Sequence, residues 1–367
     1  MLSAIRNLLL YHQSTEIENH VIYTIDADKN NEYSVPGLQG AASERVFYYS
    51  SRWNFYYTCK QLAKLLPGEN AVIVAHDWME LGMVSNLGLQ NPVVQILHGN
   101  YDYYLDLAVK HSRWINAFIV VAADIKTKLL GMLPQRSTDI YYNKMPVPEV
   151  KGKQGHSLLS KIVFVGRCEE RKGYFVLPKI AKLLAETGNY FEWHVIGEGS
   201  LEKDNQELWT SGVNVQFYGV LTNKEILAML PSFDYLILPS LAEGMPLTVV
   251  EAMKAGLIPV VNELSGGMQE IVCNGITGFR VTNNAPDRYA EIFTILKQDH
   301  LLANNISENA KEIANRQFNP YKNTSVIENV MIKATQQVNQ KPPRKIYGSR
   351  LDQLWIPNLI TEFLRKS

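Results

Sequence analysis

The sequence has little cysteine and no surplus charge of either sign. Its three cysteines, Cys59, Cys168 and Cys273, lie far apart and form no C-x-x-C pair. An odd number of isolated cysteines provides neither a disulfide framework nor a zinc site, so we expect a cytoplasmic, reducing environment. Lysine plus arginine and aspartate plus glutamate each number 36. This balance excludes a general field that would attract nucleic acid, and we expect no nucleic-acid partner.

Long apolar runs are also lacking. No stretch reaches the roughly 18 uninterrupted apolar residues that span a bilayer. The opening residues 1–10 contain one arginine and a short apolar run. They are too short for a signal peptide or a membrane span, and no small-residue cleavage pattern follows them. We therefore expect a soluble protein and leave open peripheral contact with the inner face of the membrane.

The sequence does contain 367 residues of ordinary globular composition, 46% hydrophobic and 20% charged. That length is enough for two domains with a core each. Short β-branched or aromatic runs alternate with amphipathic segments, which predicts parallel sheets covered by helices on both faces. In the first half, strands are expected at 20–25, 45–49, 71–75, 92–97, 117–121 and 138–142, and helices at 52–66, 78–87, 101–114 and 124–132.

A segment rich in proline, glycine and lysine, 146–156, then predicts an interdomain linker. Beyond it the alternation restarts, with strands expected at 161–165, 191–196, 213–218, 235–238, 257–261 and 278–281. The tail 286–339 is expected to be largely helical, and a last helix to run over about 351–364. We assign residues 1–150 to a first domain and 157–345 to a second.

The first domain begins with a helix whose Ala4, Ile5, Leu8 and Leu9 share one face, and no strand precedes it. In a doubly wound domain the first strand is central, and the turn after it lies beside the ligand. Three interpretations stay open. The true start of the domain lies upstream, or the gene product lacks its first strand, or the domain is a variant of the usual arrangement.

Residues 238–261, LPSLAEGMPLTVVEAMKAGLIPVV, carry the most informative pattern. A strand ends at Pro239, a loop follows, and a helix starts near Pro246 and ends at Gly256, a residue suited to cap it. The backbone amides over 244–248 would then lie unpaired at a helix N-terminus, at the carboxyl edge of a parallel sheet. Such amides favour an anion, such as a phosphate, or the hydroxyls of a phosphorylated sugar.

Two carboxylates bracket these amides. Glu243 precedes the helix and Glu251 lies in its second turn, so the two can hold different parts of one extended ligand. Upstream, Arg167 follows a strand end and Lys172 precedes a helix, which places both cations over the same edge of the sheet. Fixed cations at that edge would stabilise a departing diphosphate in the transition state. No D-x-D-like carboxylate pair lies in a suitable turn, and we expect no metal.

The spacing of Glu243 and Glu251 resembles the E-x7-E signature of retaining glycosyltransferases of family 4, which have the GT-B fold. The segments IVFVGRCEERKGYFVL, WHVIGEGS, VQFYGVLTNKEILAML and SGGMQEIVCNGITGFRV resemble further parts of that family's second domain. The resemblance implies an α/β protein with two Rossmann-like doubly wound domains facing a cleft. It also implies that a helix at about 350–366 packs back on the first domain.

The resemblance implies roles for individual residues as well. Glu251 would bind the nucleotide ribose, and Glu243 the donor sugar. Arg167 and Lys172 would bind the pyrophosphate, and His98, at the end of a strand in PVVQILHGNYDYY, would lie near the transferred sugar and the acceptor. The implied catalytic residues are Glu243, His98, Arg167 and Lys172. The implied donor-binding residues are Arg167, Lys172, Gly244, Met245, Leu247, Glu251, Gly197 and Val220.

Two further stretches are less specific. His76, in the run Ala-His-Asp-Trp at 75–78, also ends a strand and resembles a segment of related enzymes. The aromatic stretch 46–57, VFYYSSRWNFYY, is assigned to the core, because aromatic residues at such spacing more often pack inside than bind ligands.

These observations favour a hexosyltransferase that acts with retention on an acceptor hydroxyl in polysaccharide or glycolipid assembly. Its donor would be a UDP-, GDP- or ADP-sugar, its acceptor a saccharide or a lipid-linked glycan, and it would need no cofactor. Two alternatives stay open. One is a non-catalytic or truncated GT-B subunit that binds nucleotide sugar and needs a partner, and the other is a sugar-nucleotide epimerase of the same fold.

Overall fold

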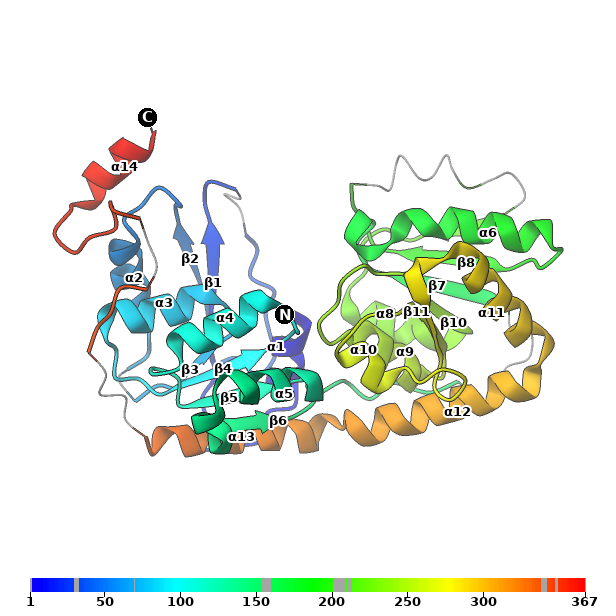
Figure 1. Cartoon of the computed structure of the whole chain (residues 1–367), viewed down its shortest axis with the longest axis horizontal. Coiled ribbons are helices and arrows are strands. Elements are labelled where there is room, and N and C mark those ends of the chain that lie inside the picture. Colours follow the sequence, from blue (N-terminus) through cyan, green and yellow to red (C-terminus); the bar gives the residue numbers. More distant parts are fainter. Residues whose placement is uncertain are drawn as a thin grey trace. The chain divides into compact units, whose positions relative to one another are not determined.

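The computed structural model describes residues 2–29, 33–68, 70–153, 160–200, 209, 213–337, 342–346 and 349–366. The chain divides into two compact units, which are coloured from blue to red along the sequence in Figure 1. Unit 1 comprises Met1–Pro146 and Pro320–Ser367, and unit 2 comprises Val147–Asn319. The sequence-based boundary at 345 differs from this division, because α13 (Pro320–Thr335) packs on strands of unit 1.

Unit 1 alternates strands and helices as its sequence predicts, and the strands lie within two residues of the expected bounds. Its elements are α1 (Leu2–Leu10), β1 (His20–Asp26), β2 (Ser43–Tyr49), α2 (Phe55–Ala63), β3 (Ile73–Ala75), α3 (Trp78–Leu87), β4 (Val93–Leu97), α4 (Asp102–His111), β5 (Ala117–Val120), α5 (Ala123–Met132), β6 (Ile140–Tyr142), α13 and α14 (Asn358–Lys366). The last helix begins at Asn358 rather than near 351, because residues 350–351 and 354–356 form turns and a bend.

The strands of unit 1 are all parallel, but they form two sheets. β1 pairs with β2 alone, and the second sheet has the order β3-β4-β5-β6. In Figure 1, β1 and β2 form a pair of blue arrows apart from the cyan strands. A doubly wound sheet of order 3-2-1-4-5-6 divides in this way when its central strand is removed. Among the described residues, no strand joins β1 to β3.

Unit 2 matches its sequence-based strands within one residue at each end. Its elements are β7 (Lys161–Val165), α6 (Leu177–Glu186), β8 (Glu192–Ile196), β9 (Asn214–Phe217), α8 (Asn223–Met229), β10 (Tyr235–Leu238), α9 (Leu247–Ala255), β11 (Ile258–Asn262), α10 (Gly267–Ile271), β12 (Phe279–Val281), α11 (Pro286–Gln298) and α12 (His300–Gln317). The predicted linker 146–156 is described only to residue 153, where the Lys153 amide donates to Ala255 O, so this part belongs to unit 2.

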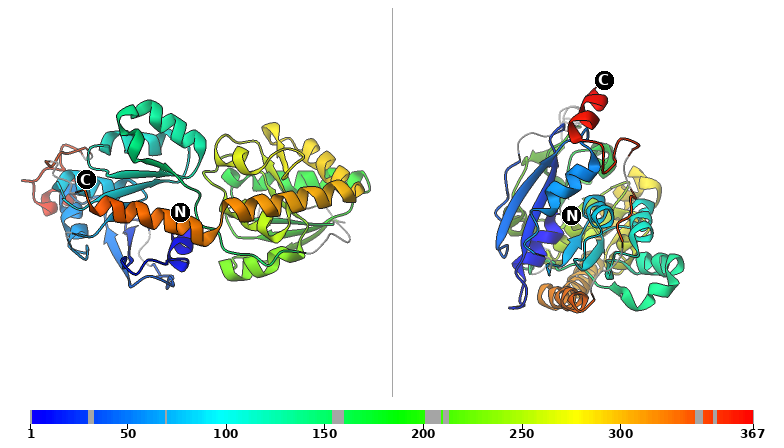
Figure 2. Two further views of the ribbon diagram at one scale, coloured as in Figure 1. Left: turned by 90° about the horizontal axis from the view of Figure 1, so that it is seen from below. Right: turned by 90° about the vertical axis from the view of Figure 1, so that its left-hand side faces the viewer.

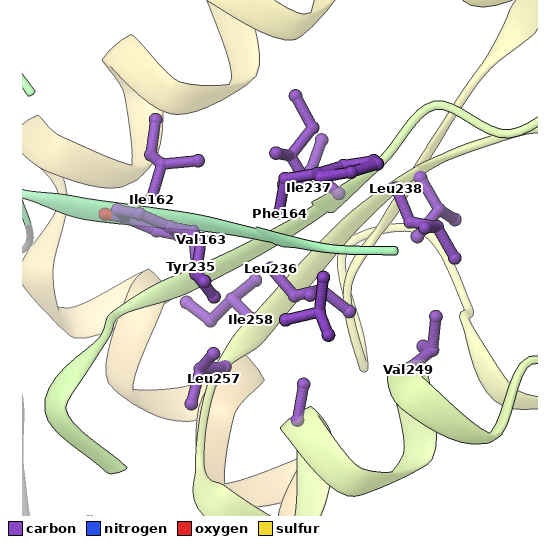
Figure 3. Packing of buried hydrophobic residues seen from close by; sticks show 14 of the residues in the cluster. Ile162, Val163, Phe164, Tyr235, Leu236, Ile237, Leu238, Val249, Leu257 and Ile258 are labelled. Carbon is purple, nitrogen blue, oxygen red and sulfur yellow. The ribbon is translucent and has the colours of Figure 1, made fainter. Parts of the chain in front are cut away.

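One parallel sheet runs through unit 2, in the order β12-β11-β10-β7-β8-β9. The central strands β7, β10 and β11 are almost entirely buried, and apolar side chains such as Phe164, Tyr235 and Ile258 cover both faces. Figure 3 shows these residues interleaved above and below the strands. Helices α9 and α12 pack together, as do α6 and α11, as a parallel sheet with two buried faces requires.

A buried lysine on α9 joins the two ends of unit 2. Lys254 is 1% exposed, and its Nζ donates hydrogen bonds to Val147 O at 2.8 Å and to Phe318 O at 2.9 Å. Burial lowers the pKa of Lys254 to about 8, and it outweighs the opposing effect of Glu149 and Glu251. The charged ammonium group is tolerated because two backbone oxygens accept the hydrogen bonds that water would otherwise accept.

This shift predicts a specific pH dependence of stability. Between pH 8 and 10 the folded lysine has lost its proton while the unfolded lysine keeps it, so raising the pH favours the folded state, by at most about 1.4 kcal/mol per pH unit. We expect the free energy of unfolding of the wild type to rise over this range relative to that of Lys254→Met, measured by urea titration. Tyrosine ionisation is common to both proteins and cancels. Parallel pH profiles would contradict the shift.

Candidate functional site

The strand order of unit 2 predicts where a ligand binds. It is the 3-2-1-4-5-6 order of a dinucleotide-binding domain, with β7 as strand 1 and β10 as strand 4. In such sheets the chain turns opposite ways after strands 1 and 4, and ligands bind outside the carboxyl ends at that point. The loops after β7 and β10 carry Arg167, Lys172 and Glu243.

A glycine brings these two loops into direct contact. Gly173 ends a short 3-10 turn, Glu170–Lys172, with φ of +68°, and a Cβ added there would lie 1.9 Å from Pro239 O. The Leu241 amide also donates to Arg171 O at 2.9 Å. The turn that carries Lys172 therefore lies against the loop that leads to Glu243.

Lys172 and Glu243 form an ion pair at this contact. Lys172 Nζ lies 2.5 Å from Glu243 Oε1, and the two side chains are 19% and 14% exposed. The family resemblance implied that Lys172 and Glu243 bind different parts of a ligand, whereas the structure brings the two side chains together. Removing one partner of such a largely buried pair leaves the other charge uncompensated, which is costly. A second anion arriving here can therefore compete with Glu243 for the ammonium group.

Arg167 precedes the same turn in the chain, and its side chain is largely exposed to solvent. Its side chain is 62% exposed, and Nη1 lies 2.6 Å from Glu169 Oε1. Because exposed ion pairs contribute little stability, this guanidinium can exchange its partner for a ligand at small cost.

Gly197 has a structural requirement of its own. Its φ is +127°, and a Cβ there would lie 2.0 Å from Gly166 O, where the loops after β7 and β8 meet. The Gly166 amide donates to Ile196 O, and the Cys168 amide donates to Glu198 O. This close approach explains why residue 197 is a glycine, and the explanation does not require that the glycine contact a ligand.

The start of α9 offers unpaired amides. The helix begins at Leu247, with Pro246 as its N-cap rather than its first residue, and Gly256 caps its end in the left-handed conformation as predicted. Among the described residues, the amides of Met245 and Leu247 donate to no acceptor, whereas those of Val249 and Val250 bond to Pro246 O. Gly244 and Met245 lie against Gly267, where a Cβ would be 2.7 Å from Met245 Cε. The amides thus have a fixed position at the carboxyl edge of the sheet.

Glu251 is buried within α9, at 4% exposure, and accepts a hydrogen bond from Asn223 Nδ2 at 3.4 Å. Asn223 is the first residue of α8, and sequence reasoning missed it, although it directly follows a capping threonine, Thr222. Val220, by contrast, is 71% exposed after β9.

His98 belongs to unit 1 and forms a pair that the sequence analysis did not foresee. It follows β4, while His76 follows the neighbouring β3, and Nδ1 of His76 lies 2.8 Å from Nε2 of His98. The rings stack with an interplanar angle of 24°. Burial lowers the pKa of His76 to about 4 and holds that of His98 well below its usual value. At pH 7 the pair is therefore uncharged, with one N–H shared between the facing nitrogens.

Comparisons with known proteins bear on the family and on the fold. Residues 151–313 match the family model described as glycosyl transferases group 1. This chain is similar to the Anabaena protein Alr3699/HepE, whose structure was solved in complex with UDP-glucose. The similarity covers 86% of this chain and 99% of the HepE chain, with a TM-score of 0.68 and 17% sequence identity. The chain has the GT-B fold.

Curated relatives of this GT-B chain match mainly over part of their length. The amylovoran biosynthesis glycosyltransferase AmsK of Erwinia amylovora is 31% identical over 147 residues, which are 38% of this chain and 36% of AmsK. The UDP-Gal:alpha-D-GlcNAc-diphosphoundecaprenol alpha-1,3-galactosyltransferase of Escherichia coli is 27% identical over 46% of this chain and 44% of its own. The chain thus spans less than half of the length of these relatives.

The aromatic stretch 46–57 of the GT-B chain is only partly in the core. Phe47 and Phe55 are buried, whereas Tyr48 and Tyr57 are exposed, so the core assignment is wrong for the latter two. The stretch spans the end of a two-stranded sheet and the start of α2, where alternate residues face solvent. No helix of the described residues is both long and apolar enough to cross a membrane.

The contact between Gly173 and Pro239 predicts the effect of a single methyl group. Gly173→Ala should lower the free energy of unfolding by about 2 kcal/mol or more beyond the control, because the new Cβ meets a backbone oxygen that cannot move away. The matched control is Gly188→Ala, with φ of +74° and nothing within 4 Å, which should lose only about 1 kcal/mol from backbone strain. Equal losses in urea titrations of the two variants would show that the close approach is absent in solution.

Proposed function

We propose that this GT-B chain is a retaining glycosyltransferase that moves a hexosyl unit from a nucleoside-diphosphate sugar to an acceptor hydroxyl. The product would enter polysaccharide or glycolipid biosynthesis. The observation that carries the proposal is the Lys172–Glu243 pair beside the unpaired amides of α9, at the point where the sheet order of unit 2 reverses. The names of the relatives and the UDP-glucose bound to the Anabaena neighbour support it.

The donor diphosphate has suitable partners in this arrangement. Its negative charge would displace Glu243 from Lys172, and Arg167 would exchange Glu169 for a phosphate oxygen. The amides of Gly244, Met245 and Leu247 would then face the phosphate and the sugar, where a helix N-terminus favours negative charge. The released Glu243 carboxylate becomes available to the sugar hydroxyls. Glu251, with Asn223, would hold the ribose, and Gly197 and Val220 lie in the loops proposed to surround the base.

Transfer then requires stabilisation of the leaving group. The bond from the anomeric carbon to the diphosphate oxygen breaks, and its electron pair stays with the nucleoside diphosphate. The acceptor oxygen bonds to the same face of that carbon, and its proton passes to the departing diphosphate. Lys172 and Arg167 stabilise this developing charge, and we assign no enzyme nucleophile. We further propose that no metal or cofactor is needed and that UDP is the preferred nucleotide.

Lys172→Met tests the charge assignment. We expect kcat to fall by about 100-fold, because one fixed cation is lost from the developing diphosphate charge, with a much smaller change in donor affinity. Arg171→Met is the matched control, since Arg171 is the exposed neighbour in the same turn, and it should retain turnover. Initial rates with UDP-sugars, with and without a chelator, provide the measurement. Equal losses in the two variants would remove the assignment.

Glu251→Gln tests the ribose contact. The amide keeps the size of the side chain but removes its charge, so donor affinity should weaken by about 1.5–3 kcal/mol. Isothermal calorimetry with UDP and with a UDP-sugar measures it, and a thermal melt checks folding. Unchanged affinity in a folded variant would place the ribose elsewhere.

A second candidate function rests on the divided sheet of unit 1. A chain with an incomplete first domain can bind nucleotide sugar without transferring it, as a subunit that needs a partner. Saturable donor binding by the purified chain, with neither transfer nor donor hydrolysis, would favour this alternative.

A further inference from the structure

The last part of unit 1 presents large apolar side chains to solvent. We call these residues the 354–363 face, and their exposed fractions run from 50% to 79%. They are Leu354, Trp355, Leu359, Ile360 and Phe363. Such a concentration of exposed apolar residues in ten positions is unusual for a protein surface and marks an interaction site.

Helix α14 is turned the opposite way from an ordinary surface helix. Its polar residues Asn358, Thr361 and Arg365 recur at intervals of three and four and face the protein. Thr361 is fully buried and donates to Leu351 O, and Asn358 Oδ1 accepts from the Asn54 amide at 2.8 Å. The apolar residues occupy the other side. Amphipathic helices of globular proteins normally bury their apolar side, so this orientation needs an external partner.

A polar network holds the face in this orientation. Asp352, 5% exposed, accepts from the Phe55 amide at 2.6 Å and from Arg365 Nη2 at 2.7 Å. Asn54 Nδ2 donates to Gln353 O and Ile356 O, both at 2.9 Å. These bonds fix the chain on both sides of Trp355 to the start of α2. Figure 2 shows α14 in red beside that part of unit 1.

The surroundings of the face are basic. Residues 342–365 contain four arginines or lysines and two acidic residues in a chain of zero net charge. Arg344, Lys345 and Arg350 are exposed, whereas Asp352 is buried and paired with Arg365. Two further aromatic residues, Trp53 and the exposed Tyr57, pack edge to face on the adjacent α2 segment, and Arg365 bonds to Trp53 O.

We propose that the 354–363 face docks on the surface of a membrane that contains anionic lipids. An apolar strip with tryptophan and phenylalanine inserts between lipid headgroups, and neighbouring arginine and lysine side chains attract anionic headgroups. Helix α14, with nine residues, is far too short to cross the bilayer, so it lies along the interface. This inference goes beyond the proposed transferase activity and does not depend on it.

Vesicle binding by the full chain tests the proposal. We expect cosedimentation with vesicles of phosphatidylcholine and phosphatidylglycerol, weaker binding to phosphatidylcholine alone, and weakening by salt. Leu359→Asp should reduce the affinity at least tenfold. Leu301→Asp on α12 is the matched control, because Leu301 is 78% exposed and Leu359 79%, and it should bind as the wild type does. The double variant Arg344→Glu, Arg350→Glu should lose the preference for anionic vesicles.

Trp355 provides a second readout. Of the six tryptophans, all within the described residues, it alone is exposed. Lipids brominated on their acyl chains should quench the fluorescence of the wild type, and Trp355→Phe should lose most of that quenching while still binding.

Three results would overturn the proposal. The first is a folded wild type that binds no anionic vesicle. The second is equal loss of binding in Leu359→Asp and Leu301→Asp. The third is sedimentation of the wild type as a dimer that Leu359→Asp dissociates, without vesicle binding, which would make a second copy the partner.

Discussion

The candidate site depends on one close approach, that of Gly173 to the carbonyl of Pro239. Two loops that leave adjacent strands in opposite directions would otherwise spread apart. The missing side chain lets the turn after β7 lie against the end of β10, and this places a lysine within reach of a glutamate 71 positions later in the chain. The ion pair follows from that contact, so the backbone rather than the charges determines how Lys172 and Glu243 lie.

Much of unit 2 could be predicted from its sequence. Its strands are short apolar runs bounded by turns, and both faces of the sheet are covered. Neither the periodicity of the apolar residues nor the length of each run therefore left the choice between strand and helix ambiguous. The glycine cap of α9 and its unpaired amides also followed from local rules. The pairing of Lys172 with Glu243 did not, because it depends on the separation of two loops, which periodicity does not report. The close approach that requires Gly197 was missed for the same reason.

Unit 1 was harder to predict. Alternating strands and helices indicate parallel pairing, but they do not show which strands are neighbours. The division into two sheets appears only when the partner of each strand is known. The His76–His98 pair shows the same limit. Two neighbouring strands that each end in histidine suggest proximity, yet the neutral state of the rings follows from their burial. The last helix was expected to pack back on the first domain, but its composition alone did not show that its polar side would face inward.

The bonds of Lys254 have a consequence for the order of folding. The backbone oxygens of Val147 and Phe318 accept hydrogen bonds from the same nitrogen, Lys254 Nζ. The chain therefore enters and leaves unit 2 at one place, and unit 2 is an insertion in unit 1 whose two ends adjoin. During synthesis its whole sequence is available before α13 emerges. Unit 1, by contrast, must wait for residues beyond 320 to cover β4 and β5. Unit 2, which carries the candidate site, can therefore reach its native state while unit 1 is still incomplete. This is the reverse of the usual order, in which the N-terminal domain folds first.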